Sequence, residues 1–63
     1  MTLELIFKGD NNKTVHKTII HNQSSSPKEG ERVIYGKYRG ITGFVEKDYT
    51  DRLNIRVKVT IKI

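Results

Sequence analysis

The last eleven residues of the chain, 53–63, alternate strictly between apolar and polar side chains. The apolar members are Leu53, Ile55, Val57, Val59, Ile61 and Ile63. Only an extended strand places alternate residues on opposite faces, so this period of two predicts a long strand with one buried and one solvated face. The β-branched side chains in this segment favour the same conformation. Such a strand needs further strands beside it to bury its apolar face.

Residues 1–21 are typical of a β-hairpin. In the first run Leu3, Leu5 and Phe7 share one face, and the turn residues 9–12 interrupt the run. Gly, Asp and Asn tolerate the positive φ values of tight turns. The second run, residues 13–21, alternates less regularly, and it leaves the register of the hairpin open.

Two registers are compatible with this hairpin. A three-residue loop would set Phe7 opposite Val15, whereas a two-residue loop would pair Glu4 with Lys17. The first places apolar side chains together and the second forms an ion pair across the strands. The sequence does not choose between them.

The rest of the chain supplies a linker and three more strands. Residues 22–30 form a polar loop with Pro and Gly, and residues 32–35, 41–47 and 53–63 have strand character around a glycine-rich bend at 36–40. Five short strands without a helical period predict an all-β fold, a small SH3-like barrel, because closure hides strand edges. We expect one domain over 1–63. The predicted core comprises Leu3, Leu5, Phe7, Val33, Val45, Leu53, Ile55, Val57, Val59 and Ile61.

The segment GERVIYGKYRGITGFV, residues 30–45, resembles the KOW motif of SH3-like barrels. Gly30, Val33, Gly40, Gly43 and Val45 occupy the positions of the glycines and valines of that motif. Glycine permits the sharp corners of a tiny barrel. In those barrels the motif lies near the start, whereas a hairpin precedes it in this chain. In length and layout the chain is also similar to short proteins of phages and prophages of Gram-positive bacteria, a group that implies no particular activity.

The KOW resemblance implies a binding function. KOW-bearing modules of ribosomal and transcription-elongation proteins contact RNA or protein, and their loops between strands meet the partner. On this basis Lys37, Tyr38 and Arg39, which lie in the bend, are the first candidate contact residues.

The charge distribution indicates an anionic partner. Twelve Lys and Arg against seven Asp and Glu give a net charge of +5, and residues 52–63 contain no acid. A basic excess attracts phosphate polymers, and single-strand binders combine cations with aromatic rings on which bases stack. The predicted nucleic-acid-binding residues are Lys37, Tyr38, Arg39, Arg52, Arg56, Lys58 and Lys62. The competing interpretation is that these cations are solvated and protect an exposed strand from edge pairing.

The favoured function is therefore a small non-catalytic module, an accessory protein of phage or prophage type, that binds RNA or single-stranded DNA. The alternative is a protein-interaction module or a homodimer. Ile6 and Ile20 fall on the less apolar faces of the first two runs, and side by side they would form an exposed apolar patch of the kind that marks an interface.

The sequence does not favour catalysis, a metal or a cofactor. There is no Cys, and the odd spacing of His16 and His21 points them to opposite faces of a strand. Glu46, Asp48 and Asp51 surround one turn but lack the glycine and terminal glutamate of a calcium loop. No apolar run approaches the length of a membrane span, and no basic–apolar leader is present, so we expect a cytoplasmic protein without membrane contact.

Overall fold

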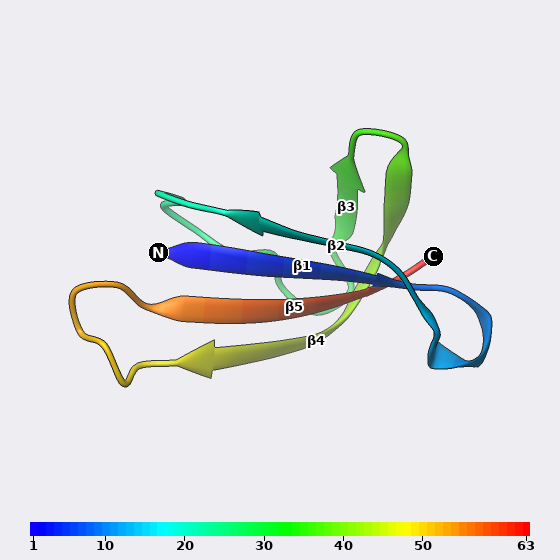
Figure 1. Cartoon of the computed structure of the whole chain (residues 1–63). Coiled ribbons are helices and arrows are strands. Elements are labelled where there is room, and N and C mark those ends of the chain that lie inside the picture. The colour runs from blue at the N-terminus through cyan, green and yellow to red at the C-terminus, as the bar shows by residue number, and fades with distance from the viewer.

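The computed structural model describes all residues, 1–63, as one five-stranded sheet without an α-helix (Figure 1). The strands are β1 (Thr2–Lys8), β2 (Thr14–Ile20), β3 (Arg32–Tyr35), β4 (Tyr38–Asp48) and β5 (Arg56–Lys62), and a single 3-10 turn, η1 (Asp10–Asn12), joins β1 to β2. Their order across the sheet is β2-β1-β5-β4-β3. The sheet curls into a half-barrel, which confirms the predicted all-β class and is consistent with a small SH3-like barrel.

The first and last strands of the chain lie side by side in the middle of the sheet. β1 pairs with β5 in parallel, and each has an antiparallel neighbour on its other side, β2 and β4 respectively (Figure 1). The N-terminal hairpin and the C-terminal half therefore share one core.

The core is formed by the alternating apolar residues of these two central strands. The buried side chains are Leu3, Leu5, Phe7, Val57, Val59 and Ile61. They face each other in register across the parallel pair, and Val33, Val45 and Ile55 pack against them while partly exposed. Each fully buried side chain of this size stabilises the fold by roughly 1.5–3 kcal/mol.

Leu53 does not join this core, contrary to the prediction. Its side chain is 98% exposed, because β5 begins only at Arg56. The carboxylate of Asp51 accepts a hydrogen bond from the Leu53 amide (3.0 Å), and the Asp51 carbonyl accepts one from the Asn54 amide (3.2 Å). Residues 51–54 are thus a turn, and the alternation there is not that of a strand.

Neither candidate register of the N-terminal hairpin is present, although the ion pair between Glu4 and Lys17 does form between residues that are not directly opposite. Phe7 lies opposite His16 and Glu4 lies opposite Ile19, and a β-bulge shifts the register between Phe7 and Lys8. The connection is longer than expected because η1 contains Asn11 and Asn12 at positive φ (61° and 57°). The turn geometry, rather than the match of apolar side chains, sets the pairing.

This register decides which face each residue of β2 occupies. Ile20 lies opposite Leu3 and packs against the core, whereas Val15 and Ile19 are exposed on the other face. The predicted patch of Ile6 with Ile20 therefore does not form, since these two side chains are on opposite faces of the sheet.

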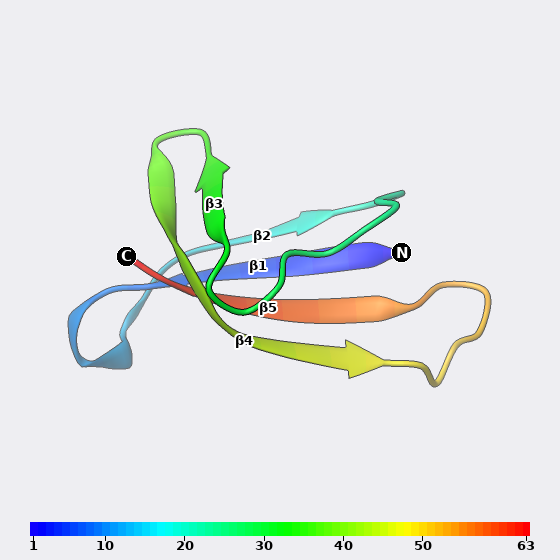
Figure 2. The ribbon, with the colours of Figure 1, turned by 180° about the vertical axis from the view of Figure 1, so that it is seen from behind.

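The polar loop at residues 21–31 crosses the inner face of the half-barrel (Figure 2). At one end the Gln23 amide donates to the Met1 carbonyl, and the N-terminal ammonium donates to the Gln23 carbonyl, both at 2.9 Å. At the other end the Gly30 amide donates to the Thr42 carbonyl (2.7 Å), and the Thr42 amide donates to the Glu31 carbonyl (2.9 Å). The loop is thus tied to β1 and to β4.

β4 bends sharply, and the bend carries β3 away from the plane of the other strands (Figure 1). The predicted bend at 36–40 contains the β3–β4 turn at Gly36, whose φ is 59°, but β4 already begins at Tyr38. A Cβ at Gly40 would collide with the Lys62 carbonyl oxygen and would lie 2.9 Å from Ile61 Cγ2. Only glycine fits where β4 passes so close to β5.

Aromatic rings connect the two edges of the half-barrel. The His16 ring on β2 stacks on the Tyr38 ring at the start of β4, with centroids 4.3 Å apart and planes 6° apart. Tyr38 also contacts Phe7 (5.6 Å), and Tyr35 on β3 lies 6.4 Å from His16. No backbone pairing joins β2 to β3, so these side chains bring the two edges together.

Candidate nucleic-acid interface

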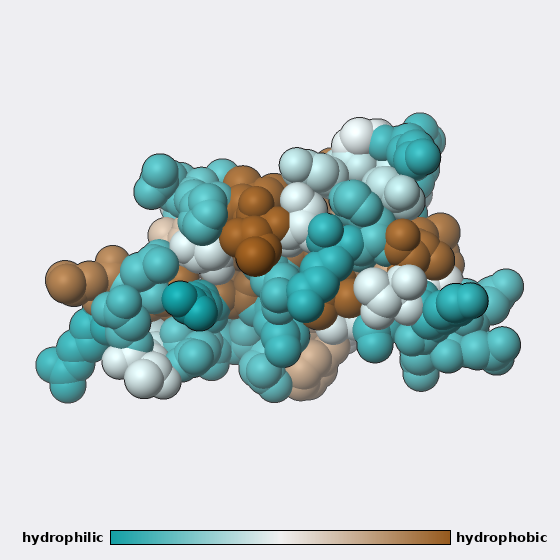
Figure 3. Space-filling view, viewed as in Figure 1, coloured by the Kyte–Doolittle hydropathy of each residue, from teal (hydrophilic) through white to brown (hydrophobic).

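The outer face of the sheet, opposite the core, carries the charged residues of the strands except Lys47, which lies opposite the buried Val57. Because β1 and β5 are in register, their outward residues form rows across the sheet: Thr2 with Arg56, Glu4 with Lys58, and Lys8 with Lys62. Figure 3 shows this face as mostly hydrophilic with separate apolar patches. The two halves of this face differ in whether acidic residues lie beside the cations.

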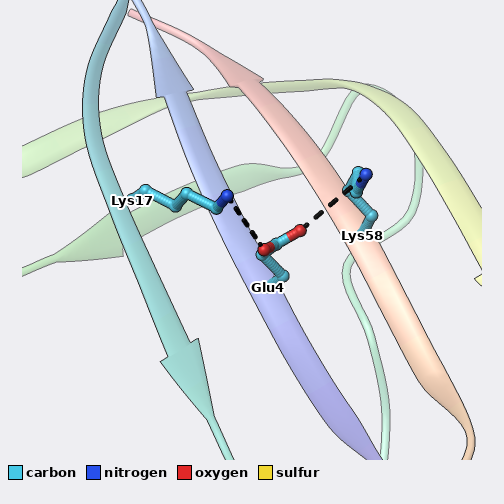
Figure 4. Close-up of polar contacts among 3 residues, drawn as sticks. All are labelled: Glu4, Lys17 and Lys58. Carbon is cyan, nitrogen blue, oxygen red and sulfur yellow. Dashed lines mark ion pairs between the residues drawn. The ribbon is translucent and has the colours of Figure 1, made fainter.

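In the first half, at the start of β1 and β5, acids lie among the cations. The Glu4 carboxylate on β1 lies 3.3 Å from Lys17 Nζ on β2 and 4.0 Å from Lys58 Nζ on β5 (Figure 4). Figure 4 shows both lysines directed at this one carboxylate from the two flanking strands. We call this region the charge-paired half; its charged residues are Glu4, Lys17, Glu46, Asp48, Arg56 and Lys58.

β4 adds two more acids to the charge-paired half. Glu46 lies opposite Lys58, and Asp48 lies opposite Arg56. The pKa of Asp48 is lowered from its ordinary value of 3.8, first by the hydrogen bond from the Thr50 hydroxyl, then by the Thr50 amide, with a smaller contribution from Arg56. Asp48 therefore stays ionised beside Arg56 to lower pH than an ordinary aspartate.

A hollow of about 410 Å³ lies over the charge-paired half. Its lining includes three carboxylates, those of Glu4, Glu46 and Asp48, alongside Arg56 and Lys58. The acids repel phosphate groups, so this hollow does not suit a polyanion.

The second half contains cations without acids. Lys8, Lys62, Ile41 and Arg32 form a continuous row across β1, β5, β4 and β3. The next pair on this side, Ile34 with Arg39, adds a further cation. We call this region the acid-free half; it consists of Lys8, Arg32, Ile34, Arg39, Ile41, Phe44 and Lys62.

Apolar side chains are exposed among the cations of the acid-free half. Phe44 is 54% exposed, Ile41 44% and Ile34 63%. The bulge between Thr42 and Phe44 sets this arrangement, because Thr42 is buried on the inner face while the Phe44 ring faces outward opposite Thr60. An aromatic ring with an accessible face thus lies close to the row of cations.

The predicted contact residues on the strands separate between the two halves. Arg39 and Lys62 belong to the acid-free half, and Arg56 and Lys58 belong to the charge-paired half. The basic residues of β5 therefore do not form one continuous cationic surface, because acids of β1 and β4 lie beside Arg56 and Lys58.

The other predicted contact residues lie elsewhere. Lys37 is exposed in the β3–β4 turn, and Arg52 is exposed in the β4–β5 turn, outside both halves. Tyr38 is half-buried, and its ring contacts His16, Phe7 and the Lys37 ammonium, which lies 5.5 Å from the ring centroid. The Tyr38 ring is thus part of the packing between β1, β2 and β4.

Sequence reasoning missed Lys8, Arg32 and Phe44. Nothing in the linear order connects Lys8 with Arg32, since their place in one row depends on strand pairing. Phe44 could have been found, because alternation about the predicted core residue Val45 places its neighbour on the outer face.

Comparison with known proteins gives no match: no family model, curated protein or solved structure is significantly similar to this chain. No group of three His, Asp or Glu side chains is arranged to hold a metal ion. No helix is long and apolar enough to cross a membrane.

Proposed function

We propose that this protein is a non-catalytic module that binds single-stranded RNA or DNA through the acid-free half of its outer face. The observation that supports this proposal is the row Lys8, Lys62, Ile41 and Arg32, in which three cations cross four strands without an acid. Arg39 and the exposed Phe44 ring lie beside that row.

The chemistry of this surface suits an unpaired strand. Lys and Arg bind phosphate oxygens and release counterions from the polymer. A base that is not paired can stack on Phe44, and such stacking contributes about 1–3 kcal/mol per base. A duplex hides its base faces, so we expect single strands to bind more tightly than duplexes.

Two sequence features belong to the same proposal. The KOW-like pattern of residues 30–45 contains Phe44, and modules with that motif contact RNA or protein. The length and layout of the chain are similar to those of short phage and prophage proteins, so we include an accessory role of that type and a cytoplasmic location.

The test compares two double charge reversals of equal size. The first, Arg39→Glu with Lys62→Glu, lies in the acid-free half; the second, Lys37→Glu with Arg52→Glu, lies outside it and changes the net charge by the same amount. Binding of labelled oligouridine and oligothymidine is measured by fluorescence anisotropy over a series of salt concentrations. Circular dichroism verifies that each variant is folded.

We expect the first variant to bind at least about tenfold more weakly, and its salt dependence to be less steep by about 1.4 in log–log slope, the value for two lost phosphate contacts on a single strand. The second variant should change affinity by less than about twofold. Equal losses in the two variants would indicate general attraction to the net charge. No binding by the unmodified protein at low salt would refute the proposal, and binding of a protein partner to the acid-free half would then be the alternative.

A further inference from the structure

β2 is an edge strand with one open side. It pairs with β1 alone and runs over the seven residues Thr14–Ile20, whereas β3, the other edge, has four. Backbone amide and carbonyl groups on the open side of an edge strand lack a strand partner and can pair with another chain.

The open side of β2 is flanked by exposed apolar residues. Val15 is 47% exposed and Ile19 is 55% exposed; Ile19 lies on the outer face opposite Glu4, and alternation through Lys17 places Val15 on the same face. Figure 3 shows an apolar patch over the end of β2. No Pro interrupts the strand. These are features of a strand that can accept another strand beside it.

The one lysine of β2 does not guard this edge. An edge lysine protects a sheet when its charge lies over the open side. Figure 4 shows Lys17 extending from β2 toward β1, where its Nζ lies 3.3 Å from Glu4. Glu4 also lies 4.0 Å from Lys58 Nζ. One carboxylate is thus shared by two ammonium groups, and these three side chains keep a net positive charge.

The charge of this segment favours an acidic partner over a second copy of the chain. From Lys13 to His21 there are two lysines and two histidines and no acid. Two copies paired along β2 would bring two such segments together, and their like charges would oppose the pairing, whereas an acidic segment would be attracted to them.

We propose that β2 binds an extended acidic segment of another protein by strand addition. The segment carries an apolar residue, an acidic residue and a second apolar residue at alternate positions, so that they lie beside Val15, Lys17 and Ile19 on the outer face. Its backbone completes the hydrogen bonds of the open side of β2. This proposal does not depend on nucleic-acid binding, because none of these three residues belongs to the acid-free half.

The first test uses synthetic peptides as long as β2. The probe alternates valine and threonine, with a central glutamate in place of one valine. The control has the same side chains and charge but carries N-methyl groups on the amides that face β2, which removes hydrogen bonds without changing electrostatics. We expect the methylated peptide to bind at least about tenfold more weakly, and amide exchange of β2 to slow with the probe alone. Equal binding of the two peptides would overturn the proposal.

The second test separates strand addition from charge attraction. Val15→Lys with Ile19→Lys adds positive charge, so pure attraction would raise the affinity for the acidic probe. Strand addition predicts a fall of about fivefold or more, because apolar contacts are lost and lysines now lie at the edge. Both positions are about half exposed, so the variant should fold, as circular dichroism verifies. Its oligouridine binding should not fall.

Light scattering of the unmodified protein tests whether a second copy of the chain, instead of an acidic segment, pairs with β2. The proposal expects a monomer over a wide range of concentrations. A dimer that dissociates when Val15 and Ile19 are replaced by Lys would show that a second copy occupies β2, and it would overturn the acidic-peptide proposal.

Discussion

The two halves of the outer face are built on the same central strands, yet they differ in chemistry. In the charge-paired half, Lys58 has Glu4 on one flanking strand and Glu46 on the other. In the acid-free half, Lys62 on the same strand has Lys8 and Ile41 as neighbours. Whether an acid lies beside a cation is thus decided by the neighbouring strands, and not by the position of the cation in a basic run.

The largest expected effect comes from breaking the corner that builds the acid-free half. Gly40→Ala places a Cβ against the Lys62 carbonyl and should lower the free energy of unfolding by about 3 kcal/mol. Gly43→Ala is the matched control, because its Cβ would meet only the Thr60 carbonyl oxygen at 3.9 Å. Urea unfolding measures both. Equal destabilisation would mean that the close approach at Gly40 is not what shapes the corner.

The next effect concerns the aromatic ring of the acid-free half. Phe44→Ala should weaken binding of oligouridine by about tenfold, since one stacked base contributes about 1–3 kcal/mol. The slope of affinity against salt should stay the same because no phosphate contact is lost. Tyr49→Ala is the control, an aromatic residue that is 60% exposed and lies outside this half. A similar loss in both variants would contradict a specific role for Phe44.

The charge-paired half can be converted toward the acid-free one. Glu4→Gln frees both Lys17 and Lys58 from their shared carboxylate. Oligouridine affinity should rise by about threefold at low salt, with a steeper salt dependence. Glu29→Gln changes the net charge equally in the polar loop and should have a smaller effect. If the two substitutions act alike in anisotropy titrations, the neighbours of a cation do not control its availability.

The smallest effect concerns Asp48 in the charge-paired half. Its pKa is below 3.8 in the folded protein, so its contribution to stability is present above pH 3.8 and is lost as pH falls through the lowered value. Thr50→Val removes the hydroxyl donor, the main cause of the shift, and should return the pKa toward 3.8. An NMR titration of the carboxyl group measures this. Thr50→Ser keeps a hydroxyl and should keep the low pKa; a value unchanged in Thr50→Val would contradict the assigned cause.

The sequence predicted the fold where side chains alternate strictly. Leu3, Leu5 and Phe7 on one strand, and Val57 to Ile61 on another, have the period of two that assigns a buried face, and the all-β class follows from it. The core prediction was wrong at Leu53, because the period of two continues through a turn that Asp51 closes by hydrogen bonding.

The candidate site was less predictable because it depends on pairing between strands. Alternation tells which face a residue occupies but not which strand lies beside it. The hairpin register follows from the conformation of η1 and a bulge after Phe7, neither of which the apolar pattern encodes. The parallel pairing that sets Lys8 beside Lys62 joins residues at opposite ends of the chain.

The pairing of β1 with β5 also bears on how this protein forms. Three of the six buried core residues lie on β5, so the core stays incomplete until two strands far apart in the sequence have come together. High contact order of this kind slows folding. Before β5 is in place, the leucines and phenylalanine of the β1–β2 hairpin are incompletely covered, and exposed apolar surface of this kind attracts chaperones and proteases.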